Sequence, residues 1–162
     1  MESIKKIWLF LLSLALSSSF IWLLFNTSLF TNYGSVQTAR LYEMNECFQD
    51  NQIPCRWVPG LENFYGSPIF NYLPPLPYYF GEFIFYLTNS LSVSVKIVSL
   101  MSLIGGYVFI YLMTYKILGI SKASLLAIAY MTVLLLVIIF YKEGLGVAWG
   151  LMFLPLIILS LN

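Results

Sequence analysis

Four long apolar runs constrain this chain more than any other feature of its sequence. They cover residues 7–25, 97–115, 123–141 and 144–161, and each approaches the roughly 20 residues that a helix needs to cross a bilayer. Charged residues make up only 9% of the chain, against roughly 25% in soluble domains. The sequence therefore predicts an all-α polytopic membrane protein, a single membrane domain with about four transmembrane helices.

The charges that flank the first run predict its orientation. Lys5 and Lys6 precede it, so the positive-inside rule places the N-terminus in the cytoplasm. A cleaved signal peptide is the alternative, with the serines at 17–19 as its small-residue site. The apolar run continues to Phe25, however, well beyond the roughly 7–15 residues of a signal core. We expect a retained helix in a multi-pass protein of the cell membrane, followed by a large extracytoplasmic loop over residues 26–95.

The segment at residues 77–91 is apolar but short. Its apolar core has about 14 residues and is interrupted by Gly81 and Glu82, which suits an interfacial or re-entrant segment better than a span. Lysine counts do not decide the question, since both topologies leave four lysines in the cytoplasm. On length, we expect this segment to lie in the membrane interface. In the next run, Gly105 and Gly106 predict close helix packing.

Residues 53–80 combine prolines and aromatic rings at high density. Six of the seven prolines in the chain fall there. Because proline fixes φ and lacks an N–H donor, such a segment cannot form one long helix or a central strand. It is also too apolar for a disordered linker and too broken to cross a bilayer. We predict an ordered, irregular segment that lies on the membrane surface.

Residues 35–50 have the pattern of one amphipathic helix, with Leu41, Met44 and Phe48 on one side. At about 100° per residue, three carboxylates fall within about 60° of each other, with Arg40 at their border. These carboxylates belong to Glu43, Glu46 and Asp50. Arg40, a cation or a basic substrate could offset the repulsion between them, or the stripe is simply a solvated face.

The cysteines and the lack of histidine limit the chemistry. Without histidine, the chain has neither the commonest general base nor the commonest metal ligand. Cys47 and Cys55 are too few for a structural zinc site, but they could form a disulfide if their loop lies outside the cytoplasm. A net charge of +1 and the lack of a basic cluster predict no nucleic-acid partner. Membrane lipids are the expected partners.

Three motifs in the central stretch carry a resemblance to a known family. They are PCRWVP at residues 54–59, YGSPIFNY at 65–72 and PPLPYY at 74–79. These motifs resemble bacterial membrane proteins labelled 6-pyruvoyl-tetrahydropterin synthase-related, a historical label, since this chain shows nothing that would bind a pterin. The resemblance runs from about Phe30 to the end of the chain. The architecture is similar to the GT-C class of membrane glycosyltransferases, whose first extracytoplasmic loop carries the active site and contains helices lying along the membrane.

The resemblance implies transfer of a sugar from a lipid-phosphate carrier at the extracytoplasmic face. Such a reaction needs a carboxylate, with or without a divalent cation, to activate the acceptor, cationic groups for the phosphate and a dry pocket for the sugar. The catalytic candidates are Glu43, Glu46, Asp50 and Glu143, with Glu62 as a further acidic residue. The substrate-binding candidates are Arg40, Arg56, Trp57, Tyr65, Gly66, Pro68 and Lys142, with Lys96 as a further cation.

Three positions depart from the family pattern. Gln37 stands where the family has a histidine three residues before the position of Arg40, and Asn32 lies near an expected acidic position. Both differences remove a proton acceptor. Further along, Glu143 occupies the position of an expected arginine.

The same residues also have structural interpretations. Arg56 and Trp57 could anchor the loop at the interface, Gly66 could supply backbone freedom to a tight turn, and Glu143 could extend to the membrane surface. The alternative function is therefore a non-catalytic membrane scaffold that binds a lipid-linked glycan or assembles with a partner. The chain stops directly after its fourth apolar run, so we expect it to be the N-terminal part of a longer protein.

Overall fold

A computed structural model of the chain describes residues 30–61, 63, 65–140 and 144–161. Within this part of the chain the regular secondary structure is helical, and Val58 and Ser67 form one isolated antiparallel bridge. The helices are α2 (Phe30–Gln49), α3 (Ile69–Tyr72), α4 (Leu76–Thr88), α5 (Leu91–Leu118), α6 (Ile120–Phe140) and α7 (Gly144–Ser160). The predicted all-α fold is confirmed for the described residues, whereas the first apolar run at 7–25 lies outside them.

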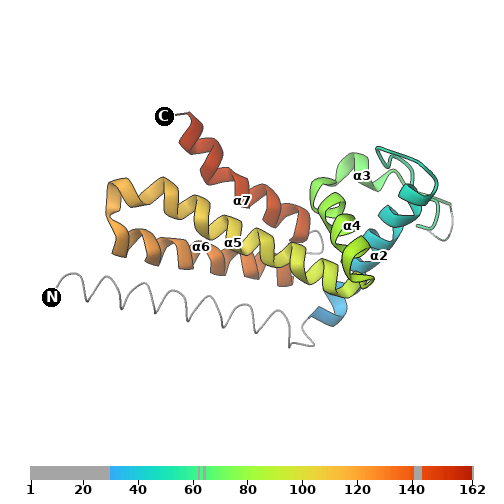
Figure 1. The fold of residues 1–162 in the computed structure, drawn as a ribbon, viewed down its shortest axis with the longest axis horizontal. Helices are drawn as coiled ribbons and strands as arrows, with labels where there is room; N and C mark the ends of the chain where they lie inside the picture. Colours follow the sequence, from blue (N-terminus) through green and yellow to red (C-terminus); the bar gives the residue numbers. More distant parts are fainter. Residues whose placement is uncertain (1–29, 62, 64, 141–143, 162) are drawn as a thin grey trace.

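Helices α5, α6 and α7 form an extended bundle, and α2, α3 and α4 gather into a compact head at one end of it (Figure 1). α5 has 28 residues and α6 has 21, and both are long and apolar enough to cross a membrane. α7 is a shorter apolar helix of 17 residues. Large apolar side chains such as Ile104, Val133 and Ile157 are exposed on all three. Helices that are apolar on their outer surfaces as well as in their contacts have the composition of membrane spans.

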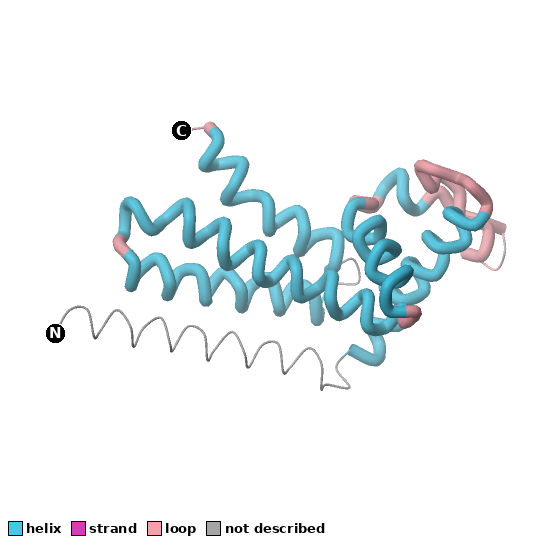
Figure 2. Tube along the Cα trace, viewed as in Figure 1, coloured by secondary structure: helices cyan, strands magenta, loops and turns pink. Residues whose placement is uncertain are grey.

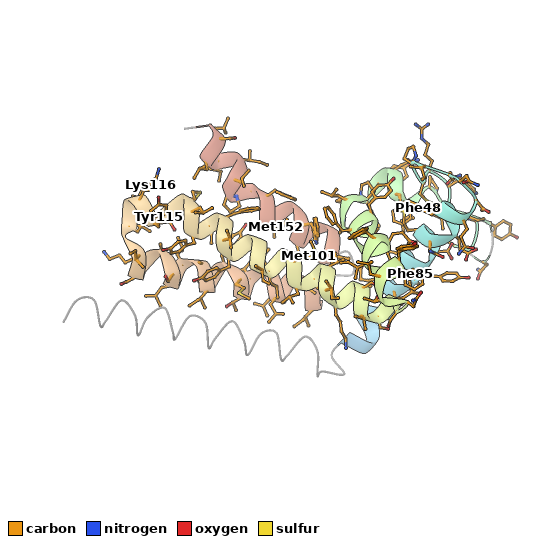
Figure 3. All side chains as sticks on the ribbon, viewed as in Figure 1. Phe48, Phe85, Met101, Tyr115, Lys116 and Met152 are labelled. Atoms are coloured by element: carbon orange, nitrogen blue, oxygen red, sulfur yellow. A yellow bond between two sulfur atoms is a disulfide. The ribbon has the colours of Figure 1, made fainter. Side chains whose placement is uncertain are left out.

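Small residues bring the helices of the bundle together. A side chain at Gly106 would overlap Leu134 of α6, and one at Gly105 would overlap Met152 of α7. Met101 and Met152 mark this middle part of the bundle in Figure 3. The predicted close packing at the two glycines is therefore confirmed. Nearer the head, Trp149 of α7 donates a hydrogen bond from Nε1 to the carbonyl oxygen of Val98 on α5, at 3.2 Å.

Several predicted boundaries need correction. α2 begins at Phe30, five residues before the predicted start of the amphipathic helix at 35. α5 begins at Leu91 instead of residue 97, because Lys96 does not limit the helix. A half-buried lysine is tolerated near a helix end, since its long apolar stem carries the ammonium outward. α6 begins at Ile120, directly after Gly119 ends α5 with a φ of 77°.

The prolines of residues 74–77 lie where a helix can begin. Pro75 is the N-cap of α4 and Pro77 lies in its first turn, where backbone N–H groups have no partner within the helix. The prediction that residues 53–80 form an irregular segment is therefore wrong from Leu76 onward, and it is also wrong for the short helix α3. The 13 residues of α4 rise about 20 Å, less than the hydrocarbon core requires. α4 lies beside α2 in the head instead of continuing along the bundle (Figure 1).

The head has its own buried interior, which is continuous with the bundle. Leu41 and Met44 of α2 are almost fully buried, as their predicted place on the apolar side of the helix requires. Met44 belongs to the same buried cluster as Tyr78 of α4, which is only 1% exposed and whose ring packs edge-on against Phe70 with centroids 5.3 Å apart. Gly81 of α4 allows close approach to α2, since a Cβ there would lie 2.8 Å from Cδ1 of Leu41.

Candidate functional site

The loop between α2 and α3 folds back over the end of α2, at the outer end of the head (Figure 2). Cys47 and Cys55 form a disulfide across it, with Cα atoms 5.5 Å apart. The side-chain oxygen of Gln52 accepts hydrogen bonds from the backbone N–H groups of Arg56 and Trp57, both at 3.1 Å. Further along, Val58 and Ser67 exchange two backbone hydrogen bonds, at 3.0 and 2.9 Å. The disulfide ties the loop to α2, and the hydrogen bonds fix the conformation of the loop itself.

An open cleft of about 560 Å³ lies between α2 and this loop, and we call it the carboxylate cleft. It is lined by Tyr42, Glu43, Glu46, Pro59 and Gly60. The backbone N–H of Gly60 donates a hydrogen bond to the Glu43 carboxylate. The approach is so close that any Cβ at residue 60 would overlap that carboxylate. A larger residue at position 60 would therefore displace the Glu43 carboxylate from its present position.

Burial dominates the electrostatics of the carboxylate cleft. Glu43 is only 8% exposed, and burial raises the pKa of its carboxyl above the ordinary 4.5, with Glu46 adding to the rise and the Gly60 hydrogen bond opposing it. Glu46 is half-buried and accepts a hydrogen bond from the Tyr42 hydroxyl, which raises the pKa of that tyrosine. A partly desolvated carboxyl group with a raised pKa is typical of side chains that accept or donate protons in catalysis.

Arg40 and Gln37 lie on the same helix as Glu43, but both side chains are buried in the head. Gln37 accepts a hydrogen bond from the Tyr78 hydroxyl at 2.7 Å. Gln37, at the position where the family resemblance predicts a histidine, thus joins α2 to α4. Arg40 lies one turn before Glu43 and also has an interaction within the fold. It is not among the residues that line the carboxylate cleft.

The remaining candidates from the loop are dispersed over its surface. Arg56, Tyr65 and Asp50 are exposed, and Pro68 is half-buried. Gly66 has a φ of 81°, which confirms the predicted need for backbone freedom in this turn. The indole of Trp57 packs so closely over Gly66 that a Cβ would be about 2.5 Å from its Nε1. None of these six residues lines the carboxylate cleft.

Other predicted residues lie outside the part of the chain that the structure describes. They are Glu62, Lys142 and Glu143. Within the described residues, no group of three or more His, Cys, Asp or Glu side chains is placed to hold a metal ion. A divalent cation therefore stays a prediction from the resemblance alone.

Sequence reasoning missed two features of the head. Gly60 and Pro59 complete the carboxylate cleft through backbone and ring atoms, and nothing in their sequence context marks them. Glu82 lines a second cleft, described below, although its sequence position suggested only an interruption of an apolar segment. The available signal was the carboxylate itself, because an ionisable residue within an apolar segment is a functional candidate by default.

Comparisons of the chain with protein-family models, with curated proteins and with solved structures find no match. The resemblance to the pterin-synthase-related membrane proteins and to the GT-C class is therefore a hypothesis that the geometry of the head has to support.

Proposed function

We propose that this chain is a membrane glycosyltransferase of the GT-C kind, or the N-terminal portion of one, with its carboxylate cleft at the extracytoplasmic face. The observation that carries the proposal is Glu43, a buried carboxylate in the wall of an open cleft, in a head at the end of an apolar bundle. The resemblance of the loop motifs supplies the substrate class, a sugar on a lipid-phosphate carrier.

The proposed topology has four spans, with the N-terminus and the α5–α6 turn in the cytoplasm. Lys116 lies at the end of the bundle far from the head (Figure 3), and Lys122 follows it in the first turn of α6. Together with Lys5 and Lys6 they put the positive charge on one side of the membrane, as the positive-inside rule requires. The Cys47–Cys55 disulfide supports an oxidising environment for the head on the other side.

In the proposed reaction the ionised Glu43 accepts the proton of an acceptor hydroxyl as that oxygen attacks the anomeric carbon of the sugar. The bond from this carbon to the phosphate oxygen breaks, and the lipid phosphate leaves with the electron pair. Arg56 is exposed on the loop, so its guanidinium is free to meet a phosphate group with two parallel hydrogen bonds. Glu46 lies one turn after Glu43, and its negative charge would strengthen Glu43 as a base.

One observation favours a second candidate function, a non-catalytic scaffold that binds a lipid-linked glycan. Gln37, at the expected histidine position, is buried and hydrogen-bonded to Tyr78. The lining of the carboxylate cleft also contains two carboxylates but neither arginine nor lysine among the described residues. A scaffold of this kind would bind the carrier without breaking the bond to its phosphate.

A transfer assay separates the two candidates. The full chain in membranes is supplied with a polyprenyl phosphate that carries a radiolabelled hexose, and release of the label from the lipid is measured. Because a general base contributes roughly 10²–10⁴-fold to a rate, Glu43→Gln should reduce release at least about 100-fold. Asp50→Asn is the matched control, since Asp50 is exposed and outside the cleft. Equal activity of wild type and Glu43→Gln would refute the assignment, and lipid binding without release would identify the scaffold.

The topology is tested independently of the activity. Single cysteines introduced at Ser90, between α4 and α5, and at Ser121, in the first turn of α6, are labelled in intact cells with a membrane-impermeant thiol reagent. We expect labelling at position 90 and not at 121. The reverse result would place the head in the cytoplasm and contradict the proposed function.

A further inference from the structure

A second cleft, of about 430 Å³, lies between α2 and α4, and we call it the aromatic cleft. It is lined by Phe48, Gln49, Tyr79, Glu82, Phe83 and Tyr86. Four of these six side chains are aromatic rings, and Glu82 is the one carboxylate among them. No residue of this lining is shared with the carboxylate cleft.

The carboxyl group of Glu82 is held on one side only. Its Oε1 accepts a hydrogen bond from Nδ2 of Asn45 at 2.5 Å, and Oδ1 of Asn45 in turn accepts one from Nε2 of Gln49 at 2.6 Å. Its Oε2 is buried and has no hydrogen-bond partner among the described residues. Burial raises the pKa of Glu82, and the Asn45 hydrogen bond opposes that rise. A buried carboxylate oxygen without a donor is unfavourable, and a ligand that brings an N–H or O–H group would supply the missing hydrogen bond.

The rings of the aromatic cleft favour a cation over a sugar. Phe48 and Tyr79 meet edge to face with centroids 5.8 Å apart, and Phe83 and Tyr86 at the rim are 63% and 80% exposed. Ring faces attract ammonium groups electrostatically. A sugar would instead need several polar partners for its hydroxyls, whereas this lining has two polar side chains besides its tyrosine hydroxyls, and the Gln49 amide already donates to Asn45.

We propose that the aromatic cleft binds a primary ammonium group, which donates an N–H to Oε2 of Glu82 and lies against the rings of Tyr79 and Tyr86. Oε2 is covered by protein, so binding requires the carboxyl group of Glu82 to turn toward the cleft that this residue lines. The ammonium could belong to a phospholipid headgroup or to a free amine. This inference goes beyond the proposed sugar transfer and does not rest on it.

The test uses the full chain, purified in a non-ionic detergent, with three probes. Dihexanoyl-phosphatidylethanolamine carries a primary ammonium, dihexanoyl-phosphatidylcholine carries a quaternary one that cannot donate an N–H, and ethanolamine is the free amine. Binding is measured by isothermal titration calorimetry below the micelle concentration of each lipid. We expect at least tenfold tighter binding of a primary amine than of the choline lipid, and at least a tenfold loss of that binding in Glu82→Gln.

Two further variants keep the test decisive. Tyr86→Ala removes a ring that is 80% exposed, so it should weaken amine binding severalfold without disturbing the fold, even if Glu82→Gln fails to fold. Asp50→Asn removes an exposed carboxylate outside the cleft and should bind as the wild type does.

The outcomes separate the sources of the amine. Binding of the ethanolamine lipid alone would identify a headgroup, and equal binding of free ethanolamine would identify a soluble amine; both support the proposal. Three results would overturn the proposal. They are equal binding of the choline and ethanolamine lipids, amine binding that neither Glu82→Gln nor Tyr86→Ala weakens, and binding of maltose to the cleft in place of the amine.

Discussion

The hydrogen bond between Tyr78 and Gln37 gives the sharpest test of how the head is held together. The two side chains come from α4 and α2, are 1% and 6% exposed, and meet with 2.7 Å between the hydroxyl and Oε1. Tyr78→Phe removes the hydroxyl and leaves the ring packed against Phe70. Depriving a buried acceptor of its donor costs about 1–3 kcal/mol. Because both groups are neutral, we expect the lower part of this range, about 1–2 kcal/mol.

The measurement is thermal unfolding of the full chain in detergent, followed by tryptophan fluorescence. For a chain of this size about 1 kcal/mol lowers the midpoint by about 2–4 °C, so Tyr78→Phe should unfold about 2–8 °C below the wild type. Tyr72→Phe is the matched control. The same hydroxyl is removed from a tyrosine that is 83% exposed, and its effect should stay within about 0.5 kcal/mol.

A double-mutant cycle isolates the bond itself. Gln37→Leu should destabilise the wild type, but it should cost less in the Tyr78→Phe background, with a coupling energy of about 0.5–2 kcal/mol. Additive effects of the two substitutions, or a Tyr78→Phe protein as stable as the wild type, would refute the reasoning.

Three further predictions concern the head and the bundle. Burial raises the pKa of Glu43 in the folded protein above its value in the unfolded chain, near 4.5. The stabilising contribution of the protonated Glu43 is therefore fully present below pH 4.5 and is lost as the pH rises through the pKa of the folded protein. Glu43→Gln should therefore raise the unfolding midpoint at pH 7.5 but not at pH 4, and an equal effect at both pH values would contradict this. Replacing both Cys47 and Cys55 by serine opens a loop with a sequence separation of 8 and should cost about 2–3 kcal/mol, measured by thermal unfolding against the oxidised wild type. Gly81→Ala should cost about 1–3 kcal/mol in the same assay, because its Cβ would lie 2.8 Å from Cδ1 of the buried Leu41, whereas an unchanged midpoint would show that Leu41 can move aside.

The features that sequence reasoning predicted correctly are those set by local pattern. Leu41 and Met44 face the interior because their spacing puts them on one side of a helix. The glycines at 105 and 106 lie at helix contacts because in an apolar helix only small residues allow close approach. Gly66 adopts the positive φ that its turn context predicted. In each case the physical requirement acts over a few residues along the chain.

The features that sequence reasoning missed depend on contacts between distant residues. The pairing of Asn45 with Glu82 joins residues 37 apart in sequence, and that separation follows from how α4 folds back on α2. Gly60 meets Glu43 only because the disulfide and Gln52 hold the loop against the helix. The start of α4 was missed for a different reason. The density of prolines argues against a helix interior, but Pro75 and Pro77 lie at the start of α4, where a helix tolerates proline.

The geometry of α2 explains why the two proposals can fail separately. At about 100° per residue, Glu43 and Asn45 point about 160° apart around the helix, so Glu43 faces the Gly60 loop and Asn45 faces Glu82 on α4. Glu43→Gln therefore leaves the aromatic cleft intact, and Glu82→Gln leaves the carboxylate cleft intact. The Tyr78–Gln37 bond, in contrast, joins α4 to α2. The aromatic cleft lies between these two helices, whereas the walls of the carboxylate cleft are α2 and the loop that follows it. Tyr78→Phe should therefore weaken amine binding in the aromatic cleft more than it affects the carboxylate cleft.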